Sequence, residues 1–121
     1  MSSLRNVPGD VSFMDEGQTL VPGRALVSDG GRYRLAFQHD GNLVLYRNEG
    51  NIPVWDWGCP GLAPATCTLT PSGLVITATD GTIVRQQQLS DATYLVITDN
   101  GCFTIFDNEA RGVWDSLGSY I

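Results

Sequence analysis

Apolar and polar residues alternate along most of the chain in short runs, among them RYRLAF, NLVLY, GLVITA, TYLVIT and CFTIF. Gly, Asp, Asn and Pro separate these runs, and such residues are typical of turns between strands. No window combines the 3.6-residue period of an amphipathic helix with a cap and a glycine stop. The pattern therefore predicts an all-β protein without a substantial helix.

This pattern recurs three times at an interval of about thirty residues. The stretches 33–56 and 94–115 share an apolar strand, an Asp/Asn/Gly turn, a second apolar strand, an acidic-polar loop and Val-Trp-Asp. A weaker copy, 67–86, has Val84-Arg85 where the others have Val-Trp. Each copy is expected to form a small sheet that cannot bury its own face alone. We assign the repeats to about 17–57, 62–88 and 91–115, within one domain spanning residues 1–121.

The alternation also predicts the register of the first hairpin. A two-residue turn would mix polar and apolar side chains on one face. A three-residue loop, 39–41, with Gly41 at positive φ, places Phe37 opposite Leu43 and makes one face wholly apolar. The third copy predicts the same register, with Ile97 opposite Phe103.

The opposite face of this hairpin is rich in hydrogen-bonding groups. It carries Gln38, Asn42, Val44 and Tyr46, with Asp40 at the loop tip. Alternation alone favours an ordinary solvated surface. However, amides, a carboxylate and a phenol around one apolar side chain match the neighbouring hydroxyls and the C–H patch of a sugar. A carbohydrate site is the alternative that this mixture favours.

Gln38, Asp40, Asn42, Val44 and Tyr46 match every specified position of the QxDxNxVxY motif. With the flanking segment 17–56, they resemble the opening repeat of the bulb-type, or monocot mannose-binding, lectin family. The resemblance implies a β-prism of three four-stranded antiparallel sheets with pseudo-threefold symmetry. It also implies that Asp40 and Asn42 bind the axial O2 hydroxyl of mannose, Gln38 binds O3, Tyr46 binds O4 and Val44 packs on the C3–C4 edge. The implied ligands are mannose and high-mannose glycans, with no cofactor and no metal.

The other two copies depart from the motif. The matching residues in the second copy are Leu69, Pro71, Gly73, Val75 and Thr77, where no polar ligand of the motif remains. Those in the third copy are Thr98, Asn100, Cys102, Thr104 and Phe106, which lack the carboxylate, the second amide and the phenol hydroxyl. A weak or altered third site and a dead one are both open, and the dead site is favoured. One working site per chain is predicted.

Several aromatic and charged residues have structural explanations. Trp55 and Trp114 resemble the axial core tryptophans of the family, and Arg85 stands where the middle one would be. We expect Arg85 to be exposed at the rim or paired with a carboxylate. Trp57 is expected either at an interface or packed beneath the loop of Cys59. His39 is interpreted as a solvated turn residue and not as a catalytic or metal-binding group.

Charge and composition narrow the classes of partner. The net charge is −6, and the seven basic residues are arginines scattered singly, which argues against nucleic acid and anionic membranes. No apolar run is long enough to insert into a bilayer. Neither a placed pair of carboxylates nor a nucleophile with its base accompanies the motif, so no catalytic residues and no enzyme are predicted. The rival is a protein-interaction or structural member of the same fold that does not bind sugar.

Three further features leave alternatives open. The N-terminus lacks the apolar core of a signal peptide, which indicates a cytoplasmic protein or one secreted after processing. Cys59 and Cys67 are near enough in sequence for a disulfide, although free thiols are favoured. The tail, 113–121, is apolar enough to exchange between two chains or to fold back on its own. A homodimer, which would bring two sites together, is the preferred assembly.

Overall fold

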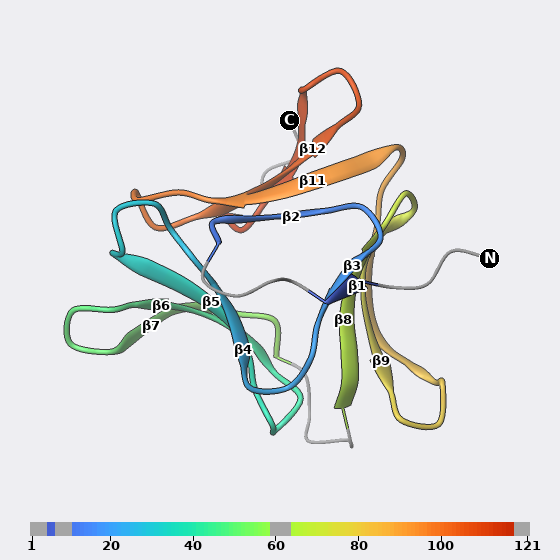
Figure 1. The fold of residues 1–121 in the computed structure, drawn as a ribbon, viewed down its shortest axis with the longest axis horizontal. Coiled ribbons are helices and arrows are strands. Elements are labelled where there is room, and N and C mark those ends of the chain that lie inside the picture. The colour runs from blue at the N-terminus through green and yellow to red at the C-terminus, as the bar shows by residue number, and fades with distance from the viewer. Residues whose placement is uncertain (1–4, 7–10, 59–63, 118–121) are drawn as a thin grey trace.

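The computed structural model describes residues 5–6, 11–58 and 64–117, and Figure 1 shows them as three sheets around a common centre. Within these ranges the chain forms strands and turns without a helix, so no helix there could cross a membrane. The strands are β1 (Arg5–Asn6), β2 (Phe13–Asp15), β3 (Gln18–Leu20), β4 (Arg24–Val27), β5 (Tyr33–Phe37), β6 (Leu43–Arg47), β7 (Ile52–Asp56), β8 (Pro64–Thr70), β9 (Gly73–Ala78), β10 (Ile83–Gln88), β11 (Ala92–Ile97), β12 (Phe103–Asp107) and β13 (Gly112–Asp115).

The three sheets form the sides of a triangular prism (Figure 1). The first sheet has the order β4-β5-β6-β7, the second β3-β8-β9-β10 and the third β2-β11-β12-β13, and neighbouring strands within each are antiparallel. The short strand β1 pairs in parallel with β3 and extends the second sheet to five strands. The prediction of an all-β prism of three four-stranded antiparallel sheets is confirmed.

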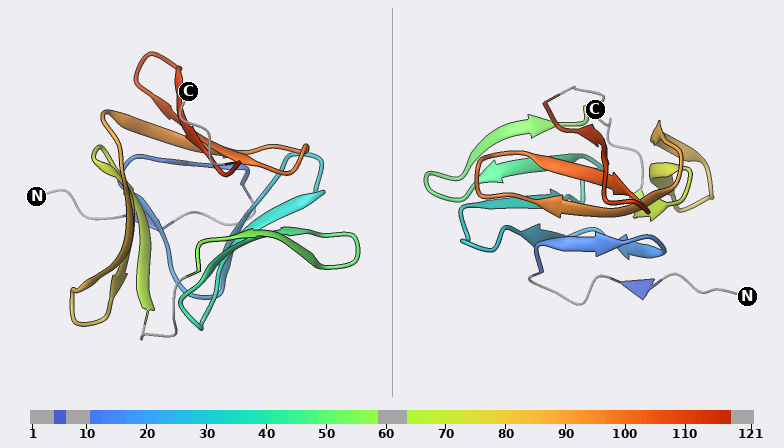
Figure 2. Two further views of the ribbon diagram at one scale, coloured as in Figure 1. Left: turned by 180° about the vertical axis from the view of Figure 1, so that it is seen from behind. Right: turned by 90° about the horizontal axis from the view of Figure 1, so that it is seen from above.

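The N-terminal segment completes the second and third sheets and not the first, which follows it directly in the chain. Strands β2 and β3 precede the first sheet in sequence, yet β2 pairs with β11 of the third sheet and β3 pairs with β8 of the second. Figure 2 shows these N-terminal strands, in blue, at one end of the prism, with the later strands stacked beyond them. The first sheet is therefore built from residues 24–56 alone, whereas the second and third each borrow a strand from a distant part of the chain.

The inward faces of the sheets share one core. The predicted register is observed: Phe37 lies opposite Leu43, and Ile97 lies opposite Phe103. These four side chains are at most 2% exposed, as are most inward-facing residues of all three sheets. Because burying a large apolar side chain contributes about 1.5–3 kcal/mol, this shared core holds the three sheets together.

Tryptophans gather where the sheets meet. The ring of Trp55 lies edge-on to that of Trp114, with centroids 6.2 Å apart, and 6.4 Å from that of Trp57. Trp57 is only 7% exposed, so it is not the exposed residue of the interface alternative. The loop of Cys59, beneath which it was otherwise expected to pack, lies outside the described ranges. Arg85 is exposed, as expected, and its guanidinium lies 5.7 Å from the centre of the Trp57 ring. Trp57 thus supplies a third aromatic ring although Arg85 occupies the middle tryptophan position.

Two expectations concern residues outside the described ranges. Cys59 lies there, so its pairing with Cys67 is not described, and Cys67 itself is buried in the core. Residues 118–121, the last four of the tail 113–121 that was considered for strand exchange, also lie outside these ranges.

Candidate functional site

The first hairpin places the five motif residues along one outward-facing ridge. Strands β5 and β6 are joined by the predicted three-residue loop, which is closed by the backbone N–H of Gln38 donating to Asn42 O at 2.9 Å. Gly41 has a φ of +90°, a conformation that suits glycine, and its N–H donates to Gln38 O at 3.0 Å. Because strand residues alternate between faces, Val44 and Tyr46 point away from the core that holds their neighbours.

Hydrogen bonds link the side chains of Tyr46, Gln38 and Asp40 and reach the backbone of Asn42. The amide of Gln38 meets the hydroxyl of Tyr46. With the amide oxygen facing that hydroxyl, Tyr46 donates to Gln38 Oε1, and Gln38 Nε2 lies 3.2 Å from both carboxylate oxygens of Asp40. Asp40 Oδ1 accepts in turn from the backbone N–H of Asn42 at 2.9 Å. The structure therefore brings together the phenol, both amide residues and the carboxylate that the sequence predicted.

The ridge differs in depth from one end to the other. Asp40 is exposed, whereas Gln38, Asn42 and Tyr46 are half-buried, so their polar groups are partly shielded from water. Val44 lies on the same face but is only 4% exposed, so the apolar contact that it offers a ligand is small. The arrangement of acceptors and donors on a shallow surface suits a polyol and offers no nucleophile.

His39 lies at the tip of the first loop, next to the motif residues. His39 is exposed at the loop tip, as predicted, and its ring lies beside Gly23, where an added Cβ would be 2.9 Å from His39 Nε2. Within the described ranges, no group of three or more His, Cys, Asp and Glu residues is placed to hold a metal ion.

Arg34 belongs to this ridge, although the sequence interpretation did not include it. Its guanidinium carbon lies 4.2 Å from the centre of the Tyr46 ring. Its Nη1 donates to Asn48 Oδ1 at 2.6 Å and its Nη2 to Asn51 Oδ1 at 2.5 Å. The predicted register contained the necessary signal, because pairing Phe37 with Leu43 also places Arg34 opposite Tyr46.

The second hairpin has a different loop from the first. Strands β8 and β9 are joined by two residues, so that Thr70 pairs with Gly73 and Leu69 with Leu74. The assignment of Leu69 to the position of Gln38 is therefore wrong, because Thr70 occupies that position and Leu69 is buried in the core. The shorter loop moves the register by one residue relative to the sequence alignment.

Gly73 stands where the first hairpin has Asn42. Its φ is +132°, and a Cβ added there would lie 1.8 Å from the backbone oxygen of Gln87 on β10. The neighbouring strand thus occupies the space that a sugar-binding side chain at position 73 would need.

The third hairpin keeps the loop of the first but uses its polar groups internally. Gly101 has a φ of +91°, and Thr98 Oγ1 bonds both Asn100 Oδ1 and Cys102 O. In place of the tyrosine, Phe106 stacks on Tyr94 with centroids 4.9 Å apart. Thr98 Oγ1 and Asn100 Oδ1 are thus engaged within the loop.

The carboxylate of the third loop faces the first sheet. Asp99 Oδ1 accepts from Ser28 Oγ at 2.5 Å, and Asp99 Oδ2 accepts from the Gly30 N–H at 2.8 Å. The hydroxyl of Ser28, followed by backbone N–H groups and the charge of Arg32, lowers the pKa of Asp99 despite some desolvation. Asp99 therefore joins two sheets.

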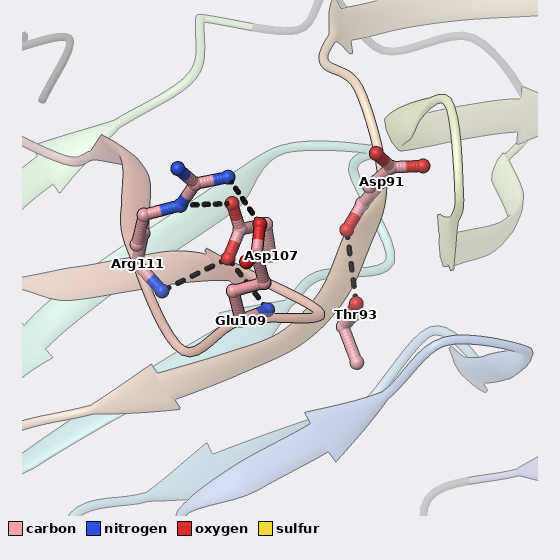
Figure 3. Close-up of polar contacts among 5 residues, drawn as sticks. All are labelled: Asp91, Thr93, Asp107, Glu109 and Arg111. Atoms are coloured by element: carbon pink, nitrogen blue, oxygen red, sulfur yellow. Dashed lines mark hydrogen bonds and ion pairs between the residues drawn. The ribbon is translucent and has the colours of Figure 1, made fainter.

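Carboxylates gather again in the loop between β12 and β13, shown in Figure 3. Arg111 bonds Asp107 Oδ2 at 3.0 Å and Glu109 Oε1 at 2.7 Å. The backbone N–H of Arg111 is the largest cause of the lowered pKa of Asp107, and the Glu109 N–H and the Arg111 guanidinium add to it. Both carboxylates are ion-paired, and the Asp107 hydrogen bonds stabilise a turn, which is a structural role.

Neither a family model nor a curated protein matches this sequence. Solved lectin structures do match. They include a Marasmius oreades lectin (22% identity, TM-score 0.76, covering 94% of this chain and 95% of the other). They also include a monomeric monocot mannose-binding lectin from Gastrodia elata, with 26% identity and a TM-score of 0.76, covering 91% of this chain and 99% of the other. A third is a Polygonatum cyrtonema lectin complexed with monomannoside, with 27% identity and a TM-score of 0.69, covering 79% of this chain and 89% of the other.

Lectins bind carbohydrate without transforming it, in agreement with the prediction of a non-enzymatic protein. The prism of three sheets is thus the fold of the monocot mannose-binding bulb lectins, and across the lectins compared the identity to this chain ranges from 19% to 28%.

Proposed function

We propose that residues 1–121 form a single mannose-binding lectin domain with one working site at the first hairpin. The site residues are Gln38, Asp40, Asn42, Val44 and Tyr46. The observation that carries this proposal is the chain of hydrogen bonds from Tyr46 through Gln38 and Asp40 to Asn42 on an outward-facing ridge. The side chains of Tyr46, Gln38 and Asp40 are thus arranged before any ligand arrives, so binding loses little of their side-chain entropy.

The roles follow from the resemblance to the bulb-type lectins. Asp40 and Asn42 bind the axial O2 hydroxyl of mannose, Gln38 binds O3, Tyr46 binds O4, and Val44 contacts the C3–C4 edge. Glucose has an equatorial O2 hydroxyl and would leave the groups of Asp40 and Asn42 partly unpaired. Because an unpaired buried polar group costs about 1–3 kcal/mol, mannose is preferred.

A single shallow site predicts weak binding of a monosaccharide, on the order of millimolar. High-mannose glycans are therefore the proposed partners, because several linked mannose residues and several sites raise the effective concentration. We propose a homodimer as the assembly that supplies two sites. The similar Gastrodia elata lectins are described as monomeric, so the assembly needs its own measurement by light scattering.

The second candidate function is protein interaction or structural support without sugar binding. It is favoured by the loss of ligands in two hairpins, where Gly73 replaces Asn42 and the polar atoms of Thr98 and Asn100 bond each other. These losses indicate that the prism does not depend on sugar-binding residues.

Isothermal titration calorimetry separates the two functions. Methyl α-mannoside and a branched high-mannose oligosaccharide are titrated into the wild type, Asn42→Asp and Asn100→Asp, with EDTA present. We expect about one site per chain, loss of binding in Asn42→Asp and unchanged binding in Asn100→Asp, which makes the same substitution in the third hairpin, at the position that corresponds to Asp40. Absence of heat with both sugars would favour the second function, and loss of binding only in Asn100→Asp would move the site to the third hairpin.

A further inference from the structure

Arg34 is held rigidly against the tyrosine of the proposed site. Its guanidinium lies over the Tyr46 ring and donates hydrogen bonds to the amide oxygens of Asn48 and Asn51 in the loop between β6 and β7. Asn48 is itself anchored, because its Nδ2 donates to Gly31 O at 2.9 Å. A planar guanidinium held by two acceptors and one ring has little freedom, so it restricts the position of the Tyr46 ring.

The ring and the two amide oxygens that the Arg34 guanidinium contacts are neutral. In the part of the chain that the structure describes, the ion pairs between residues both belong to Arg111, which contacts Asp107 and Glu109 (Figure 3). Arg34 is half-buried, and its hydrogen-bond partners are amides. A partly shielded cation without a carboxylate attracts an anion more strongly than a fully solvated one.

The same position in the other sheets shows that the fold does not need this cation. The residue opposite the Tyr46 equivalent is Thr66 in the second sheet and Tyr94 in the third. In the third sheet two stacked rings, Tyr94 and Phe106, replace the cation and the phenol. Within the prism, the cation thus occurs only on the sheet that carries the complete motif.

We propose that Arg34 is a positioning and specificity-determining residue that forms a cationic subsite beside Tyr46. This inference rests on the proposed function. The subsite takes an anionic substituent (phosphate, sulfate or carboxylate) on a mannose residue whose ring occupies the motif. Two of the five guanidinium N–H groups bond Asn48 and Asn51, which leaves others for an oxyanion. The ligand class is therefore an acidic, mannose-containing glycan.

Carbon 6 of mannose is the natural place for the anionic group. If Tyr46 contacts O4, as the resemblance implies, carbon 6 is attached to the ring carbon next to the one that carries O4. A substituent there extends from the edge of the sugar that faces Tyr46 and its cation. Since the whole chain has a net charge of −6, any preference for an acidic sugar has to come from a local group.

The test compares methyl α-mannoside with its 6-phosphate and with the corresponding 6-carboxylate, by calorimetry with EDTA at low and moderate salt. The variants are Arg34→Gln, Arg34→Lys and, as a control with the same change of net charge on another sheet, Arg85→Gln. We expect the wild type and Arg85→Gln to bind the acidic sugars about tenfold more tightly than the neutral one, and salt to weaken only this preference.

Arg34→Gln should bring the acidic and neutral sugars to within about twofold of each other, and Arg34→Lys should retain part of the preference because it keeps the charge. A purely structural role of Arg34 would lower both affinities together and leave their ratio unchanged, which would overturn the inference. Equal or weaker binding of the acidic sugars by the wild type, with methyl α-mannoside still bound, would also overturn it and leave the proposed function intact. Failure of all three sugars to bind would overturn both.

Discussion

Replacement of Gly73 by alanine tests whether β10 leaves room for a side chain at the position that Asn42 holds in the first hairpin. Gly73 occupies the position of Asn42, has a φ of +132° and lies so close to β10 that a Cβ would approach Gln87 O to 1.8 Å. The contact involves two backbones, so no side-chain rotation relieves it. Contacts of a Cβ atom shorter than 3.0 Å are essentially never seen. To lengthen the 1.8 Å contact to that distance, β9 and β10 would have to separate by more than about 1 Å.

The expected loss of stability has two parts. A non-glycine residue in this backbone conformation costs about 1–3 kcal/mol. Separating the strands weakens about two hydrogen bonds near Gly73, including that from the Leu89 N–H to Ser72 O, at about 0.5–1.5 kcal/mol each. Gly73→Ala should therefore lower the free energy of unfolding by about 4 kcal/mol, a large part of the 5–15 kcal/mol typical of a domain.

Gly81→Ala is the matched control. Gly81 also has a positive φ, +89°, but nothing lies within 4 Å of an added Cβ. It should cost about 1–2 kcal/mol from backbone strain alone. Urea unfolding followed by tryptophan fluorescence gives both free energies by linear extrapolation. If the free energies of unfolding of the two variants differ by less than about 1 kcal/mol, β10 does not exclude a side chain at position 73, and the proposed clash is refuted.

Acid should destabilise the protein partly through Asp107, whose pKa is lowered chiefly by the backbone N–H of Arg111. Its folded pKa is below the ordinary 3.8, so the stabilisation is present above that value and lost as pH falls through the folded pKa. Asp107→Asn should therefore make the free energy of unfolding, measured by urea titration, fall less steeply between about pH 5 and pH 2. An unchanged dependence of that free energy on pH would contradict this. Trp57→Ala should lower the free energy of unfolding by about 3–5 kcal/mol, because it empties a buried site. Arg85→Gln, which removes only the exposed cation above that ring, should lower it by about 1 kcal/mol or less, and equal losses would refute the core role of Trp57.

The all-β class and the first hairpin followed from local rules, whereas the prism was implied by the resemblance to the bulb-type lectins. Strand residues alternate between faces, so the apolar run around Phe37 and Leu43 allowed one register that buries a whole face. A glycine at positive φ is a local requirement of the three-residue loop, and Gly41 and Gly101 met it in both predicted hairpins. The same rule failed for Leu69, because the second loop is one residue shorter and no alternation within that loop signals its length.

Sequence by itself thus determined which residues face the core, where the first loop turns and which polar side chains share its outward ridge, since all three depend on strand periodicity and turn chemistry. Only the tertiary structure decided which strands complete each sheet, because β2 and β3 pair with partners about 50 to 80 residues away. It also decided that the buried ring of Trp57 lies near Arg85 and that β10 leaves no room for a side chain at Gly73. The hydrogen bonds from Arg34 to Asn48 and Asn51 likewise depend on the tertiary structure. These contacts join segments whose separation in space depends on the packing of all three sheets, which no local pattern encodes.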